Sequence, residues 1–408
     1  MAARPVDEPH RVSSPLELLF DLTFVVAVAA VTAQFAHSIA DGHALAGLVP
    51  FLQVFFAVWW AWMNFTWFAT WYDTDDVLYR LLTMVQMAGV LVLASGVRAA
   101  ADDSDYRAVA TGYLIMRTAL VAQWLRAGVE DPAGRRAALR NALGIAVAQA
   151  GWVVWLVLAE TGALPSWAQV PSFACLAALE LAVPRWAERN SPANWHPHHI
   201  AERYGLFTII LFGESVLAAS NGVHGALEET TTGRPPIIIV AGSGLILLFA
   251  LWWLYFLAPA GEGLNDRRHL SYLWGYGHYG IFASLAALGA GLEVAVEQTG
   301  HDLKASSLAI CSAVAVPTAL FVAFLWMVDT PILAEPVLRP AVVLCGVTTI
   351  LLLPLAAARI GIVAVIAAIT AVCVLMTAVT IARSEDGPRG SRLGRRACQG
   401  RHPASTSL

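Results

Sequence analysis

The chain has 408 residues, of which 58% are hydrophobic and only 13% are charged. Its mean hydropathy of +0.63 lies well outside the range of soluble globular domains. The formal net charge of −4 supplies no basic face for a nucleic acid, so we expect no nucleic-acid partner. This composition predicts a protein whose main partner is the lipid bilayer.

Twelve apolar runs along the chain are long enough to cross a bilayer, which takes about 20 residues of helix. They cover residues 18–39, 45–68, 81–99, 106–125, 139–159, 167–186, 204–221, 237–257, 272–296, 308–328, 337–358 and 362–381. The runs are continuous rather than alternating, which indicates helices that satisfy their backbone groups internally. The first run lacks the features of a cleavable signal peptide, so we expect it to remain as the first span. The sequence thus predicts an all-α, polytopic membrane protein.

The distribution of basic residues predicts how these spans are oriented. Nineteen Lys and Arg residues fall in segments on the side of the N-terminus, five fall on the opposite side, and Arg117 lies inside a span. Cytoplasmic loops carry the excess of positive charge in membrane proteins. We therefore expect a multi-pass protein of the cell (inner) membrane with both termini in the cytoplasm.

An internal repeat is indicated at an offset of 193 residues. The segment 56–60 (FAVWW) recurs as 249–253 (FALWW), and the same shift moves Asp73 onto Asp266 and Asp21 onto Glu214. A shift of six spans preserves membrane orientation, which is typical of parallel repeats. We expect a cytoplasmic segment at 1–16, two six-helix halves at 17–190 and 191–383, and a disordered cytoplasmic tail at 384–408.

Two acidic motifs resemble those of a known family. Residues 15–25 read PLELLFDLTFV, and residues 199–207 read HIAERYGLF, followed by Gly-Glu-Ser at 213–215. These segments, together with the Trp-rich second span and the acidic turn after it, are similar to the bacterial low temperature requirement A (LtrA) family. The family's usual Phe-Phe-Asp reads Leu-Phe-Asp here, which keeps the carboxylate of Asp21. The resemblance implies a multi-pass bacterial membrane protein and no established substrate or reaction.

Ionisable residues inside the apolar runs are the candidate functional residues, because a charge at bilayer depth is costly unless it is paired or solvated. The candidates for a coupling or substrate cavity are Glu17, Asp21, Arg117, Glu180, Glu214 and His278. Glu17 and Asp21 are one helical turn apart, so they can share a proton or a cation. Glu17 can instead serve the first helical turn, where the helix dipole favours an acid.

Arg117 needs an anion at depth, because a guanidinium group stays protonated. Its partner is expected among Glu214, Glu180, Asp21 or an anionic substrate, with Glu180 alternatively reaching the membrane interface. We expect Asp21, Glu214 and Arg117 to lie in one polar cavity between the two halves. His278 is either a proton relay or a neutral histidine bonded within the bundle.

Polar residues at the predicted cytoplasmic ends form a further motif. Its members are Asp73, Asp76, Arg80, Glu202 and Arg203. His198 and Glu202 share a helical face but lack a third ligand, so we expect no metal and no cofactor.

Two functions fit these features. The first is a proton- or cation-coupled transporter of a small solute, with Asp21 and Glu214 as coupling residues and Arg117 as their counter-ion. The second is a membrane-integrated sensor of cold or bilayer state, or an accessory protein, that transports nothing. An enzyme is not expected, because no nucleophile–base pair or metalloprotease motif is present.

Overall fold

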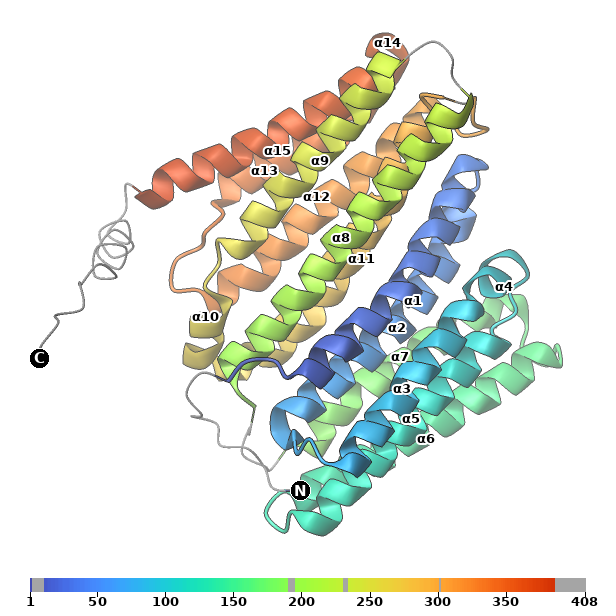
Figure 1. Cartoon of the computed structure of the whole chain (residues 1–408), viewed down its shortest axis with the longest axis vertical. Coiled ribbons are helices and arrows are strands. Elements are labelled where there is room, and N and C mark those ends of the chain that lie inside the picture. The colour runs from blue at the N-terminus through green and yellow to red at the C-terminus, as the bar shows by residue number, and fades with distance from the viewer. Residues whose placement is uncertain (2–10, 190–194, 230–233, 301, 386–408) are drawn as a thin grey trace, which may run out of the picture.

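The computed structural model describes residues 1, 11–189, 195–229, 234–300 and 302–385, and the regular structure of these residues is helical throughout. The predicted tail falls almost entirely outside the described residues. Two groups of long helices lie side by side, one coloured blue to green and the other yellow-green to red (Figure 1).

The first group contains the helices up to residue 187. They are α1 (Pro15–Ala40), α2 (Ala44–Tyr72), α3 (Val77–Ser95), α4 (Val97–Asp102), α5 (Arg107–Glu130), α6 (Arg135–Glu160) and α7 (Ser166–Ala187). Helix α1 packs against α2 and α3, and the contacts then pass from α3 to α5, α6 and α7. This order follows the chain, as expected for antiparallel helices joined by short loops.

The second group contains the remaining helices. They are α8 (Pro197–Glu229), α9 (Arg234–Phe256), α10 (Ala260–Asp266), η1 (Arg268–Leu270), α11 (Ser271–Glu297), α12 (Ser307–Ile332), α13 (Pro340–Leu352), η2 (Leu353–Ala356), α14 (Ala357–Ile360) and α15 (Ile362–Glu385). Helix α8 packs against α9 and α11, α11 packs against α12, and α15 packs against α9 and α13. The neighbours of α8 thus resemble those of α1, but the parallel repeat itself stays a prediction.

Eleven of the described helices are long and apolar enough to span a membrane, and they match eleven of the twelve predicted runs. The remaining prediction, residues 106–125, corresponds to α5, which contains Arg107, Arg117 and Arg126. Helix α5 nevertheless has 24 residues, which is about 36 Å of helix and enough to cross the hydrocarbon layer.

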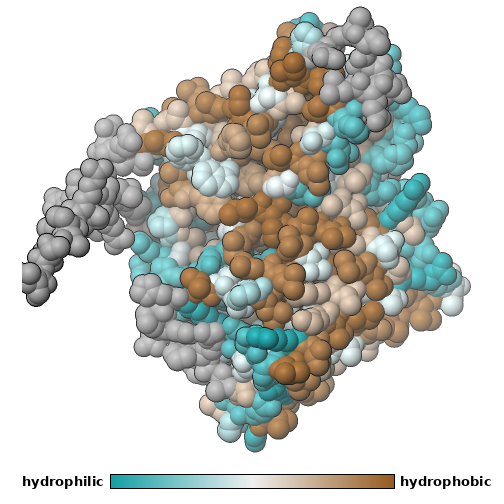
Figure 2. Space-filling model, in the orientation of Figure 1, coloured by the Kyte–Doolittle hydropathy of each residue, from teal (hydrophilic) through white to brown (hydrophobic). Residues whose placement is uncertain are grey.

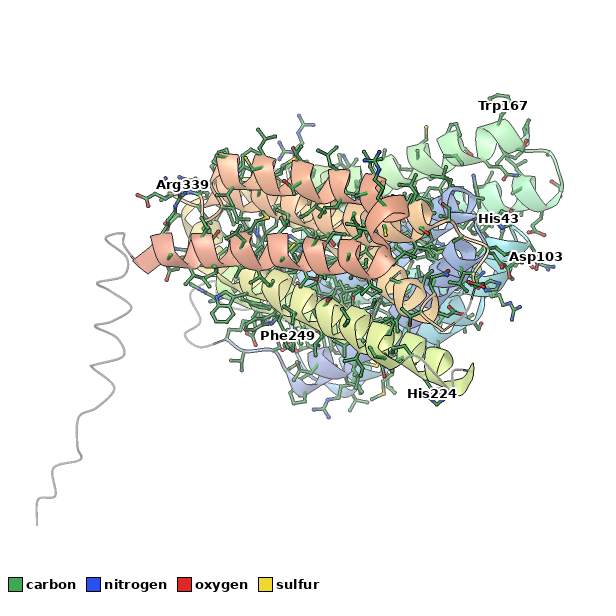
Figure 3. The ribbon with its side chains drawn as sticks, turned by 90° about the horizontal axis from the view of Figure 1, so that it is seen from above. His43, Asp103, Trp167, His224, Phe249 and Arg339 are labelled. Carbon is green, nitrogen blue, oxygen red and sulfur yellow. The ribbon has the colours of Figure 1, made fainter. Side chains whose placement is uncertain are left out.

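The loops alternate between the two ends of the bundle. Figure 3 shows His43, Asp103 and Trp167 at one end and Arg339 at the other. Asp103 lies just before α5, and Trp167 lies just after α6. Because both residues are at the same end of the bundle, the chain crosses the bundle along α5 and returns along α6. In Figure 1 the start of α1 and the end of α15 lie toward the same end, as an even number of spans demands.

Apolar side chains cover much of the outer surface. Figure 2 shows hydrophobic surface across the middle of one face and hydrophilic residues gathered toward the ends. Large residues such as Phe249, Leu375 and Leu143 are more than half exposed. In a membrane these side chains contact lipid tails, so they can lie on the outer surface without being exposed to water.

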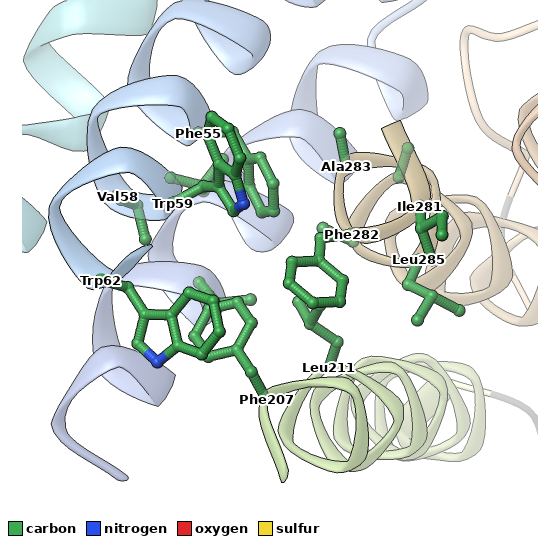
Figure 4. Packing of buried hydrophobic residues seen from close by; sticks show 14 of the residues in the cluster. Phe55, Val58, Trp59, Trp62, Phe207, Leu211, Ile281, Phe282, Ala283 and Leu285 are labelled. Carbon is green, nitrogen blue, oxygen red and sulfur yellow. The ribbon is translucent and has the colours of Figure 1, made fainter. Parts of the chain in front are cut away.

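Aromatic side chains pack where the two groups meet. Figure 4 shows Trp62 of α2 facing Phe207 of α8, with Phe282 of α11 beside them. The rings of Trp62 and Phe207 stack with centroids 4.2 Å apart, and Phe282 lies 5.1 Å from Phe207. Ring pairs at these distances add to the free energy of burial. The two groups are therefore held together by a packed core, with α11 buried on nearly all sides.

Candidate functional site

Two carboxylates lie at the start of α1. The backbone N–H of Ser14 donates to Glu17 Oε2 at 2.8 Å, and the Glu17 N–H donates to Ser14 Oγ at 3.3 Å. This is a capping box, so Glu17 does serve the first helical turn. Asp21 lies one turn further along, on the same side of the helix.

Two basic residues lie at the start of α8. The helix begins at Pro197, seven residues before the predicted start of this span, and proline is favoured at a first helical position. The early start places His199 and Arg203 inside the helix, again one turn apart. Arg203 is therefore a buried residue of the bundle and not part of a cytoplasmic segment, which corrects the sequence-based interpretation.

The acidic turn of α1 and the basic turn of α8 face each other. Arg203 Nη1 lies 2.7 Å from Glu17 Oε1, and Arg203 Nη2 lies 2.5 Å from Asp21 Oδ1. His199 Nε2 lies 3.2 Å from Glu17 Oε1. All four side chains are at most 2% exposed. We call this set, Glu17, Asp21, His199 and Arg203, the α1–α8 charge cluster.

Helix α2 closes the charge cluster on a third side. Trp62 Nε1 donates to Asp21 Oδ1 at 2.7 Å, which joins the aromatic core to the cluster. Arg203 Nη2 donates to Thr66 Oγ1 at 3.4 Å, and His199 Nδ1 lies 2.8 Å from Thr70 Oγ1. Asp21 Oδ2 has no hydrogen-bond partner among the described residues.

Hydrogen-bonding groups flank both ring nitrogens of His199. Thr70 Oγ1 lies 2.8 Å from His199 Nδ1 and 3.2 Å from the Thr66 carbonyl oxygen, and its single proton can serve either contact. His199 Nε2 faces the Glu17 carboxylate, which only accepts. The His199 ring is thus held between a hydroxyl group and a carboxylate.

Among the described residues, the charges of the cluster balance when one proton is bound. Glu17 and Asp21 carry two negative charges, and Arg203 carries one positive charge. Arg11 and Asp73, which act on Tyr79 together with Glu17 and Arg203, add one charge of each sign. The cluster is thus neutral with one bound proton. Without that proton it carries one buried negative charge, which costs free energy in surroundings of low dielectric constant.

A second buried ion pair lies within the first group of helices. Arg117 Nη2 of α5 is 2.5 Å from Glu180 Oε2 of α7, and both side chains are at most 1% exposed. Glu180 also accepts hydrogen bonds from Trp60 at 2.9 Å, Tyr113 at 3.0 Å and Trp152 at 3.3 Å. Of the expected partners of Arg117, the structure therefore selects Glu180, which is buried and does not reach the interface.

The structure does not bring Asp21, Glu214 and Arg117 together, so the prediction of one shared cavity is wrong. Asp21 pairs with Arg203, and Arg117 pairs with Glu180. Glu214 is 11 residues beyond Arg203 on α8, or about 16 Å along the helix. It is buried, with Oε2 lacking a hydrogen bond, and lies near Glu293 of α11.

His278 is engaged on both sides of its ring. Its Nδ1 lies 2.7 Å from the Trp274 carbonyl oxygen, and its Nε2 lies 3.1 Å from the Tyr255 hydroxyl. The carbonyl requires a proton on Nδ1, which leaves Nε2 to accept from Tyr255. This is the arrangement of a neutral, bonded histidine, the second of the two roles considered for it.

The residues of the predicted cytoplasmic motif make different contacts in the structure. Asp76 caps α3 through the Tyr79 N–H at 2.9 Å and pairs with Arg126 at 2.5 Å, and these donors hold the pKa of Asp76 well below its usual range. Arg80 pairs with Asp75 at 2.6 Å. Asp73 ends α2, and Glu202 accepts the Ser13 N–H at 3.3 Å. Among the described residues no group of His, Cys, Asp and Glu is arranged to hold a metal.

A many-helix bundle with lipid-facing sides and buried ion pairs defines a polytopic α-helical membrane protein. The chain belongs to the family of bacterial low temperature requirement A proteins (LtrA), whose profile matches residues 12–381. It is also similar to a protein of Rhizobium meliloti (strain 1021) described as "Uncharacterized protein RA0937". The two are 27% identical over 293 residues, which is 66% of each chain and so just under two thirds of that relative. No solved structure matches the chain.

Sequence reasoning named Arg203 as part of a cytoplasmic motif but did not pair Arg203 or His199 with the acids of α1. A hydropathy window penalises the His and Arg residues at the start of α8, so the span was placed too far along the chain. The spacing was informative nevertheless, because His199 and Arg203 are four residues apart, as are Glu17 and Asp21. Two such pairs of opposite charge at the starts of two spans indicate a possible contact.

Proposed function

We propose that the protein is a proton-coupled transporter of a small solute and that the α1–α8 charge cluster holds the coupling proton. The observation that carries the proposal is the contact of His199 with Glu17, two buried groups that can share a proton. The pair joins the first helix of one group to the first helix of the other. A change in the relative position of the groups would therefore alter the proton's surroundings.

The electrostatics support coupling of this kind. With the proton bound, two acids and two cations neutralise each other in a buried site. Without it, one negative charge remains, and its desolvation favours a rearrangement that admits water or a cation. Arg203 stays charged in both states, because its guanidinium does not lose a proton in proteins. Proton binding and helix packing are thus energetically linked.

Proteoliposomes with an entrapped pH-sensitive dye test this proposal. A panel of amino acids, sugars, amines and inorganic salts is added outside, and solute-dependent proton movement is recorded. We expect at least one solute to drive proton movement in the native protein. Glu17→Gln should lower that rate about tenfold or more, since glutamine keeps the volume and the capping hydrogen bond but not the charge.

Glu160→Gln is the matched control, because Glu160 is a partly exposed acid at the far end of α6. It should transport like the native protein. Full proton movement in folded Glu17→Gln would refute the role of the cluster. If no solute in the panel moves protons, the result contradicts transport and favours the second function, a membrane-integrated sensor or accessory protein.

A further inference from the structure

A separate cavity lies near the starts of α8 and α11 and the ends of α9 and α12. It has a volume of 410 Å³, and α10 forms part of its wall. The side chains that line it and carry chemistry are Glu202, Tyr255, Phe256, Trp274, His278 and Asp329. These residues take no part in the α1–α8 charge cluster, although Glu202 precedes Arg203 in the chain.

The charge of this cavity is negative. Two carboxylates, those of Glu202 and Asp329, are among its lining residues, and no Lys or Arg is. Neighbouring arginines are engaged elsewhere. Arg203 is turned toward α1, and Arg267 donates to the carbonyls of Pro331 at 2.7 Å and Leu333 at 2.6 Å. Among the described residues, the lining therefore offers two carboxyl groups and no Lys or Arg side chain.

The remaining walls suit a cation with an organic surface. Tyr255, Phe256 and Trp274 present aromatic rings, whose faces attract ammonium groups. His278 is neutral in its hydrogen-bonding arrangement, so it adds no repulsion. The Tyr255 hydroxyl donates its proton to His278, and the Thr208 hydroxyl is a second hydrogen-bonding neighbour of its oxygen.

Trp274 and Asp329 lie close together in the wall of the cavity. The Trp274 side chain is 1% exposed, and its Nε1 makes no hydrogen bond of normal length, although the Asp329 carboxylate lies close enough to interact with it. A buried donor beside an acid normally completes its bonding. A ligand that carries both an ammonium and an acceptor atom would satisfy Asp329 and Trp274 together.

We propose that this cavity is a binding site for an ammonium group on a small organic molecule. A hard metal ion is a poorer fit, because Mg²⁺ and Ca²⁺ take six or more oxygen ligands. Ile209 and Phe256, at the edge of the cavity, are 48% and 39% exposed on the lipid-facing side. The ammonium can thus come from a free amine or from the headgroup of an ethanolamine lipid. The site does not depend on the proton cluster.

Calorimetric titration of the full chain in nanodiscs of phosphatidylglycerol, which has no amine, tests the free-amine source. Ethanolamine should bind saturably, whereas ethylene glycol, its uncharged analogue, should not. Asp329→Asn should weaken ethanolamine binding about tenfold, and Glu202→Gln, at a partly exposed position, should weaken it as well. Asp103→Asn, an exposed acid at the opposite end of the bundle (Figure 3), is the control and should bind like the native chain.

A second arm tests the lipid source. Protein purified from mixed phosphatidylethanolamine and phosphatidylglycerol should retain the ethanolamine lipid above its bulk fraction, and free ethanolamine should compete with it. Retention without free-amine binding assigns the site to the lipid headgroup. Neither amine binding nor lipid enrichment in the native chain would overturn the proposal. Equal binding by native, Asp329→Asn and Glu202→Gln proteins would also overturn it, because the amine would then bind elsewhere.

Discussion

Replacing Glu180 by glutamine should destabilise the protein more than any exposed change, because it strands Arg117. The guanidinium is 1% exposed, its Nη2 makes a 2.5 Å bond to Glu180, and its Nε and Nη1 have no hydrogen-bond partner in the described structure. Glutamine offers one weak acceptor in place of the carboxylate. Removing one partner of a buried ion pair costs about 3–5 kcal/mol of unfolding free energy.

The opposite change, Arg117→Met, should behave differently. Glu180 keeps its hydrogen bonds from Trp60, Tyr113 and Trp152, and it can bind a proton, whereas Arg117 cannot lose one. Protonating an ordinary glutamic acid at pH 7 costs about 4 kcal/mol, which limits the loss. Arg117→Met should therefore lose less stability than Glu180→Gln.

Equilibrium unfolding in mixed micelles at pH 7 measures these effects. The double variant Glu180→Gln with Arg117→Met should recover most of the stability, since neither charge remains. Asp105→Asn, which alters an exposed pair with Arg107, should leave unfolding unchanged. The reasoning fails if Glu180→Gln unfolds like the native protein, or if Arg117→Met loses as much stability as Glu180→Gln does.

Two further predictions concern topology and pH. A reporter active only in the cytoplasm should work when fused after Ile381, and a periplasmic reporter should work after Gly162 and Gly225; cytoplasmic activity at either glycine would contradict the orientation. Burial raises the pKa of Glu188, which follows α7, to about 7 from an ordinary 4.5, despite the hydrogen bond from Tyr272. The folded state therefore keeps a proton that the unfolded state loses, and stability falls by about 2 kcal/mol as the pH rises from 4.5 to 7. Thermal unfolding of Glu188→Gln should show a smaller loss of stability between pH 4.5 and 7 than the native protein. An unchanged pH profile would rule out this role of Glu188.

Much of the fold could be predicted because a helix that crosses a lipid bilayer must be a long, mostly apolar run of residues. Eleven spans are visible as long apolar runs, and α5 could be placed between its neighbours despite three arginines. The start of α8 could not be predicted, because its first turns carry basic residues that become buried only in the folded bundle. Their burial depends on the acids of α1, 182 residues away.

The site was less predictable for the same reason. Glu17, Asp21 and Glu180 were correctly expected to be inside the bundle, but their partners depend on which helix faces which. Arg117 has three candidate partners in the sequence, Glu214, Glu180 and Asp21, and one in the structure, and hydropathy says nothing about that choice. Glu214 likewise lies apart from Asp21 and Arg117 because of its depth along α8, and not because of its residue type.

The charge cluster also determines which halves can assemble with each other. Helices α1 and α8 begin alike, at Pro15 and Pro197, but one carries two acids and the other two bases at matching positions. Two copies of the first half would bring four carboxylates together, and two copies of the second would bring only cations. When the two halves are expressed as separate polypeptides, each should therefore assemble with the other half and not with a second copy of itself.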